Sequence, residues 1–435
     1  MRKALETSFW NSRRLLDISF ISTIIYFVLR TETFMRLQIP YGDEQSFLKA
    51  FSNIQVNGFF SEWMNGGLSP SFYILSYPFA ILFENPLIGF RVFSLSSTII
   101  TLLLLYNFAK HKLKLEGVFF YSSIILTINF LAYRIFWQGI NDDFLHLLVI
   151  YSIVLLYDSC KKKNNKNILL LGVIIGLIIG TRISAFIIIP GYIFFFLKDF
   201  KTGFKVGITA LIIGFCLHAP SLISNKTLSS INKDPENGLT WAQLNYVSQI
   251  YIYEEKIPEH SRISWEELQD YIDKNGSEHL PKTFIESVTF NWGFSIREFF
   301  NELWFTLHSI FFRFFGLGLF VILAFSFYML KSRKALNDNL KFSKSFFLFF
   351  WSYTFLLCFV VLTSLEIRWY TSFVFLGILF FHKLLEDFKW NTLKIKPELI
   401  FNINLLLLLL YQAKFIFTDS NLLSDILRKI APNIF

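Results

Sequence analysis

The sequence predicts an all-α polytopic membrane protein with about eleven spanning helices, on two observations of composition and arrangement. Of the 435 residues, 54% are hydrophobic and only 17% are charged, and the mean hydropathy is +0.48. A soluble domain carries about a quarter charged residues. The apolar residues are concentrated in long blocks, and short basic clusters separate these blocks.

Twelve apolar blocks are candidates for spans, because a membrane-crossing helix needs about 20 mostly apolar residues. They are 15–30, 70–84, 87–109, 116–135, 143–158, 167–181, 183–198, 204–220, 306–330, 345–363, 371–385 and 398–417. A polar, basic stretch precedes the first block, and no small-residue cleavage site follows it. We therefore expect a retained first helix rather than a signal peptide.

Six basic clusters lie beside the blocks, and cytoplasmic loops are typically rich in Lys and Arg. The clusters are Arg2, Lys3, Arg13 and Arg14; Lys110, Lys112 and Lys114; Lys161, Lys162, Lys163 and Lys166; Lys198, Lys201 and Lys205; Lys331, Arg333, Lys334, Lys341 and Lys344; and Lys383, Lys389, Lys394 and Lys396. All six can face the cytoplasm only if one early block does not cross. The best candidate is 70–84, which is short, starts with Pro70 and contains Pro78. We expect it to be an interfacial helix.

The eleven remaining spans predict a multi-pass protein of the cell membrane, with a cytoplasmic N-terminus and an outward C-terminus. Two long segments then face outward, 31–86 and 221–305. The second is net acidic and contains Ser264-Trp-Glu-Glu267, a capping box that predicts a short soluble helix. Neither internal repeats nor linkers interrupt the chain, so we expect a single membrane domain over 1–435.

The first outward segment carries an acidic pair, Asp43-Glu44, a few residues beyond the first span. Phe47, Phe51 and Ile54 follow at helical spacing. This pattern predicts an amphipathic helix that lies on the membrane surface.

Asn65-Gly66 and Pro70 come next, and Arg91 begins the following span. Together with the acidic pair, this order resembles the GT-C membrane glycosyltransferases. It is most similar to the branch that contains protein O-mannosyltransferases and the aminoarabinose transferases of lipid A. That branch usually has a double proline near Pro70, where this chain has a serine on each side.

The resemblance continues along the chain and implies further site residues on the outer face. They are Arg134 at the end of the third span, Asp142 and Asp143 at the second outer loop, Arg182 at the turn between the fifth and sixth spans, and Glu366, Arg368 and Tyr370 before the tenth span. The resemblance implies an inverting enzyme that takes a hexose or pentose from a polyprenyl-phosphate donor. Its acceptor would be a glycan, a lipid or a protein.

The chemistry of such a transfer requires charges of both signs. A carboxylate takes the proton of the acceptor as general base, and we assign this to Asp43, with Glu44 secondary. The leaving phosphate gathers negative charge, which fixed cations stabilise, and the planar fork of Arg matches phosphate oxygens. The cations predicted for the donor phosphate are Arg182, Arg368, Arg91 and Arg134.

Structural roles are open for several of these residues. Asp142 or Asp143 could cap the fourth span, because Asp is favoured at helix N-termini. Arg182 and Arg368 could be interfacial anchors. For Arg91 a structural role is favoured over a catalytic one.

Metal, disulfide and nucleic-acid sites are not predicted. His146 lies one turn beyond Asp143, but a lone His in a helix core is commoner than a ligand. Cys160, Cys216 and Cys358 have no motif spacing. The net charge of +9 falls in the loop clusters without interleaved aromatic residues. No cofactor is expected, and a requirement for a divalent metal is left open.

Two other functions are open alternatives. A transporter or flippase of lipid-linked glycans typically has two related halves and ionisable residues at mid-membrane depth. Here most ionisable residues lie at span ends, and no halves repeat. A polysaccharide polymerase or ligase typically uses a late outer loop rich in Arg, whereas the late loop of this chain is net acidic.

Overall fold

The structure, a computed structural model, describes residues 37–115, 123–128, 138–161, 164–230, 238–259, 261–311, 338–360 and 366–387, with a few single positions between them. Within these ranges the chain is helical and forms no strand. Three of the described helices are long and apolar enough to cross a membrane: Pro86–Lys112, Asp142–Cys160 and Phe200–Asn225. These features support the predicted all-α membrane class. The number of eleven spans stays a prediction, since several predicted spans fall largely outside the described residues.

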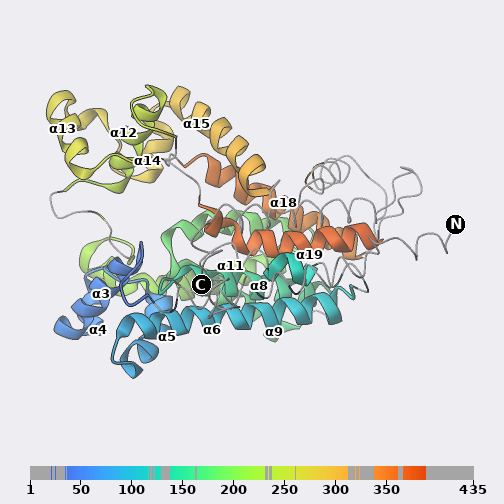
Figure 1. Cartoon of the computed structure of the whole chain (residues 1–435). Helices are drawn as coiled ribbons and strands as arrows, with labels where there is room; N and C mark the ends of the chain where they lie inside the picture. Colours follow the sequence, from blue (N-terminus) through green and yellow to red (C-terminus); the bar gives the residue numbers. More distant parts are fainter. Residues whose placement is uncertain are drawn as a thin grey trace, which may run out of the picture.

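Long helices lie side by side in a bundle (Figure 1). They are α6 (Pro86–Asn107), α8 (Asp142–Lys161), α9 (Asn165–Thr181), α11 (Phe200–Asn225), α18 (Asp338–Cys358) and α19 (Thr371–Asp387). The first residues of α6, α8 and α19 lie at the same end as the last residues of α9, α11 and α18. Three short helices also lie at this end, which we call the α3 end: α3 (Glu44–Asn57), α4 (Phe59–Met64) and α5 (Pro70–Leu82).

The described basic clusters lie at the opposite end of the bundle. Lys112 closes the π-helix η1 (Phe108–Lys112) that continues α6, and its Nζ is 2.8 Å from Oδ1 of Asp158 near the end of α8. Lys166, Lys201 and Lys341 stand in the first turns of α9, α11 and α18. The helix directions therefore bring these clusters together at one end.

Small residues allow α9 and α11 to pack closely. A Cβ on Gly172 would lie 2.5 Å from Thr209 Cβ, and one on Gly176 would lie 2.5 Å from Ile213 Cβ. Such close approach of backbones is typical of membrane helix pairs. The contact holds α9, which ends at Thr181, against α11.

The apolar stripe of α3 packs on protein, and the predicted position of this helix on the membrane surface stays a prediction. Phe47, Phe51 and Ile54 are buried. The Phe47 ring meets that of Phe72 on α5 at 5.3 Å, and the Phe51 ring meets that of Phe90 on α6 at 5.6 Å. Helical spacing of apolar residues indicates a buried face, but it does not say what covers that face.

The block predicted at 70–84 forms α5 and ends after about 20 Å of helix, short of the ~30 Å hydrocarbon core. It folds back on α6 so tightly that a Cβ on Gly89 would lie 2.4 Å from the Phe79 carbonyl oxygen. This length agrees with a helix that does not cross, and its membrane placement stays a prediction.

The block predicted at 183–198 is not one α-helix. It is two 3₁₀ turns, η2 (Ile183–Ile187) and η3 (Ile189–Tyr192), followed by one turn of α-helix, α10 (Ile193–Phe196). Pro190 lacks the N–H that an α-helix would need, and Gly191 approaches the Phe349 ring too closely for any side chain. Pro190 explains the departure from a single α-helix, and Gly191 allows the segment to pack closely on α18.

A second layer, α12–α15, stands at the α3 end beside the bundle (Figure 1). It contains α12 (Trp241–Tyr253), α13 (Trp265–Asn275), α14 (Phe284–Phe290) and α15 (Trp292–Phe305). The predicted capping box of α13 is confirmed, since the side chains of Ser264 and Glu267 bond each other's backbone N–H. However, α15 continues without a break into η5 (Thr306–Phe311), so no loop separates 221–305 from the next predicted span.

Candidate active site

Asp43 stands at the N-terminus of α3, at the position that normally caps a helix. Gly42 before it has φ +57°, a conformation that glycine adopts at little cost. The Asp43 side chain makes no capping hydrogen bond. Its Oδ2 instead accepts a hydrogen bond of 2.8 Å from Nη2 of Arg368, which is 325 positions away in the chain.

Glu44 forms a buried ion pair with Arg91 of α6. The Arg91 Nε lies 2.9 Å from Oε1, and its Nη2 lies 2.7 Å from Oε2. The backbone N–H groups of Gly139 and Tyr41 also donate to Glu44, at 2.7 Å each. Arg91 in turn donates to the carbonyl of Ile39 at 3.0 Å. Both side chains are fully buried, so this geometry favours the structural role left open for Arg91 and extends it to Glu44.

The loop before α8 is held against the end of α9. Asn141 Nδ2 donates to the carbonyl of Thr181 at 2.6 Å and to Ser69 Oγ at 3.2 Å. Asp142 follows in the first turn of α8 and is buried. Its carboxylate pairs with Arg182, and its Oδ2 lies 3.3 Å from Nη1 of Arg368. Asp142 therefore does more than cap a helix.

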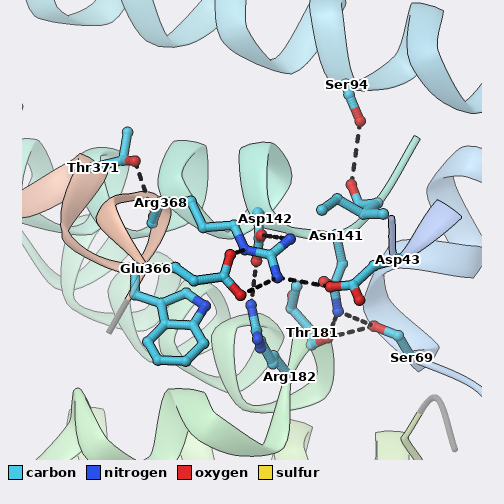
Figure 2. A network of polar contacts seen from close by, with 12 residues as sticks. Asp43, Ser69, Ser94, Asn141, Asp142, Thr181, Arg182, Glu366, Arg368 and Thr371 are labelled. Atoms are coloured by element: carbon cyan, nitrogen blue, oxygen red, sulfur yellow. Dashed lines mark hydrogen bonds and ion pairs between the residues drawn. The ribbon is translucent and has the colours of Figure 1, made fainter. Parts of the chain in front are cut away.

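Arg368 lies at the centre of these contacts (Figure 2). It belongs to the 3₁₀ turn η6 (Ile367–Tyr370), and Thr371 Oγ1 donates to its carbonyl at 2.9 Å. Besides Asp43 and Asp142, it contacts Glu366, with Nη2 2.9 Å from Oε1. Burial would lower the pKa of Arg368, but the three carboxylates outweigh burial and raise this pKa above its ordinary value. Arg368 thus stays charged.

Arg182 completes the group from the end of α9. Besides its pair with Asp142, its guanidinium lies 5.7 Å from the centre of the Trp369 ring. Figure 2 shows how charged side chains from segments distant in sequence meet here, among them Asp43, Asp142, Arg182 and Arg368. Neither Arg182 nor Arg368 is therefore only an interfacial anchor, since each binds carboxylates of the protein.

The other predicted site residues lie differently. Tyr370 is fully buried, and its hydroxyl is 3.2 Å from Thr306 Oγ1, so it supports the η6 turn. Asp143 and His146 are buried in α8 next to Asp142. Arg134 lies outside the described residues. Within the described ranges, no three His, Cys, Asp or Glu side chains are grouped to hold a metal ion.

Arg262 is close enough to the site to be affected by its charges, and sequence analysis did not single it out. It lies between α12 and α13, remains exposed, and its guanidinium is 5.2 Å from the centre of the Trp241 ring. Desolvation of the guanidinium lowers the pKa of Arg262, the charges of Glu366 and Asp43 oppose this shift, and the charge of Arg368 adds to it. The charges of the site thus extend to this side chain. A lone Arg in a net acidic segment gives no sequence signal.

The Arg262 backbone position is set by the α12–α15 layer. Ile263 is buried in the small apolar core of this layer, and its N–H donates to Ser248 Oγ at 3.2 Å. The Trp241 ring is packed edge to face against Trp265, with centroids 5.3 Å apart. The backbone at Arg262 is therefore held by a folded scaffold.

Comparison with known families bears on the class of protein and covers part of the chain. A family model described as dolichyl-phosphate-mannose-protein mannosyltransferase matches residues 70–223, about a third of the chain. No curated protein matches the chain. The matched segment runs from α5 to α11 and includes Arg91, Asp142 and Arg182, whereas Asp43 and Arg368 lie outside it. The match supports a membrane glycosyltransferase that uses a polyprenyl-phosphate sugar.

Proposed function

We propose that this chain is a GT-C type glycosyltransferase that moves a sugar from a polyprenyl-phosphate donor to a glycan, lipid or protein acceptor. The observation that carries the proposal is the contact of Asp43 with Arg368 at the α3 end of an apolar bundle. This contact brings a potential base and a cation so close together that both can reach the headgroup of one donor molecule. The family match over 70–223 supports the same donor class.

The proposed step is a single displacement at the anomeric carbon. The acceptor oxygen attacks this carbon, and the bond from the carbon to the phosphate oxygen breaks. The phosphate leaves with the electron pair, and the acceptor proton passes to Asp43. A neighbouring cation such as Arg368 favours an ionised carboxylate, which is the form that accepts a proton. Attack opposite the leaving group would invert the sugar.

Three arginines could share the donor phosphate. Arg368 is mostly occupied by carboxylates, and its side chain is only 11% exposed. The side chain of Arg182 is 22% exposed, and Arg262 is exposed at the side of the α12–α15 layer. We propose that chiefly Arg182 and Arg262 bind the phosphate oxygens. Arg368 aligns Asp43, and its positive charge adds to the stabilisation of the phosphate. Preorganised cations of this kind stabilise the charge that develops on the leaving group.

Glu44 and Arg91 are proposed as positioning residues. Their buried pair holds the backbone of residues 37–44 on α6, and this backbone carries Asp43. A general base must be held closely in place, and side chains locked by neighbours provide that rigidity.

The site is proposed to face outward. The described basic clusters lie at the far end of the bundle from Asp43, and basic residues mark the cytoplasmic side of membrane proteins. In the proposed orientation the N-terminus lies inside, as the sequence predicts, and the number of eleven spans stays a prediction. A polyprenyl phosphate with its headgroup in the outer leaflet would then meet the site directly.

Mass spectrometry of surface glycans and lipid-linked sugars, in cells with and without this protein, tests the proposed function. We expect one surface glycan modification to disappear and one polyprenyl-phosphate sugar to accumulate. Cells that lack the protein are then complemented with one of two variants. The control variant Arg297→Ala, which removes a charge on α15, should reverse both effects, whereas Arg368→Ala should reverse neither. Unchanged glycans together with an altered distribution of the lipid-linked sugar between leaflets would favour the transporter alternative.

A further inference from the structure

The outward face of α15 is apolar and aromatic along its whole length. Trp292, Ile296, Phe300 and Trp304 follow each other at every fourth position and are 58%, 49%, 62% and 70% exposed. On the preceding helix α14, Ile285 is 83% exposed. A water-facing helix normally buries such a stripe and exposes its charged residues.

The inward face of α15 is polar, whereas the buried face of a helix in water is normally apolar. Ser295, Glu298 and Glu302 are buried against the rest of the protein. Glu298 Oε2 accepts a hydrogen bond of 2.5 Å from the hydroxyl of Tyr253 on α12. Burying a carboxylate is costly unless it receives hydrogen bonds, so this face is built to pack on protein. The apolar face therefore has to be covered by something else.

The neighbouring helix α13 shows that this reversed arrangement is not general in this layer. In α13 the apolar Leu268 is buried, while Glu266 and Asp270 are exposed. This is the pattern of a helix in water. Two helices of one layer thus face two different surroundings.

The bundle helices show what covers α15. On α11, Leu211 and Phe215 are 67% and 61% exposed, and on α6 Leu103 is 64% exposed. The α15 stripe has the same character, and α15 continues without a break into η5 and the block predicted to span the membrane. Tryptophans stand at both ends of the stripe, and tryptophan is enriched where a membrane meets water.

We propose that α15 is embedded in the membrane leaflet at the α3 end, with the stripe from Trp292 to Trp304 against lipid acyl chains. The water-exposed part of the second predicted outer segment then ends near Asn291 rather than at residue 305. Because Glu298 bonds Tyr253 on α12, the embedded helix also fixes the height of the α12–α15 layer at the membrane. This inference does not depend on the reaction that the site performs.

Site-directed spin labelling tests the proposal in the full chain. Cys160 and Cys216 are exposed and are replaced by serine, whereas the buried Cys358 is kept. A nitroxide is attached at Phe300→Cys, with Asp270→Cys on α13 as the matched control. The protein is reconstituted in vesicles of phosphatidylcholine and phosphatidylglycerol, and collision rates with oxygen and with a water-soluble nickel chelate are measured.

We expect the ratio of oxygen to nickel collisions to be several times higher at position 300 than at position 270. A ratio at 300 equal to that at 270 would overturn the proposal, because it would place the stripe in water. Shielding of position 300 from both reagents would also overturn it, since a protein surface would then cover the stripe. If Phe300→Cys does not fold, Ile296→Cys on the same stripe gives the same measurement.

Discussion

Replacing Glu44 by glutamine should destabilise the protein far more than the equivalent change at its neighbour Asp43. Glu44 accepts four hydrogen bonds, two from Arg91 and one each from the backbone N–H groups of Gly139 and Tyr41. A glutamine side chain has only one oxygen, so its NH₂ group would point at N–H donors that it cannot accept from. Arg91 would also remain buried without a countercharge.

The magnitude follows from the burial of the pair. Removing one partner of a buried ion pair costs about 3–5 kcal/mol, because the other charge is left uncompensated. Asp43 contacts Arg368 through a side chain that is 26% exposed. Solvent screens such a pair, so Asp43→Asn should cost about 1 kcal/mol or less. Glu44→Gln is therefore expected to lower mainly the stability of the protein, and Asp43→Asn mainly its transfer activity.

Heat unfolding in detergent or nanodiscs measures this difference. We expect the midpoint of Glu44→Gln to fall clearly below that of wild type, while Asp43→Asn stays close to wild type. At a temperature where Glu44→Gln is still folded, it should lose less transfer activity than Asp43→Asn. Wild-type stability of Glu44→Gln would refute the positioning role and return Glu44 to the list of catalytic candidates.

Three further predictions concern the cations and the orientation. Arg368→Ala should lower the transfer rate about ten-fold or more, since it removes the charge-assisted contact that aligns Asp43, worth roughly 1.5–3 kcal/mol, and Arg368→Lys should recover only part of it; an unchanged transfer rate in both would contradict the assignment. Arg262→Ala should raise the donor KM about ten-fold by the same contact energy, while Arg297→Ala, the same charge change on the same layer, should not; equal effects would point to general charge rather than to a site contact. A cysteine at Lys112 should be protected from membrane-impermeant reagents added outside, and labelling from outside would reverse the orientation of every described helix.

Several elements of the site could be predicted because their positions depend on local rules. Gly42 before Asp43 predicts a turn, and the turn is present with positive φ. Asp142, Arg182 and Arg368 each stand at a helix end, and the alternation of spans brings these ends together. The pairing of Asp43 with Arg368 could not be predicted, since no local rule joins two residues 325 positions apart.

The different environments of Asp43 and Glu44 also could not be predicted. Two adjacent carboxylates look alike in a sequence, and only the way α3 lies on α6 decides which one meets Arg91. The same limit applies to apolar stripes. Phe47 on α3 and Phe300 on α15 each belong to a stripe of apolar residues at helical spacing. Phe47 is nevertheless buried in protein, whereas Phe300 is exposed. Periodicity identifies a face, and only the packed structure shows its partner.

The transfer activity of Asp43→Asn is the most direct test of the account. Purified wild type and variant would be compared in nanodiscs with a polyprenyl-phosphate sugar and the acceptor identified from the cellular glycans. Asparagine keeps the shape of the side chain and removes its basicity, and general-base catalysis is typically worth about 10²- to 10⁴-fold in rate. We predict a loss of that size with normal unfolding and normal donor binding. Transfer at a rate near that of wild type would contradict the assignment of Asp43 as the base and favour the transporter alternative.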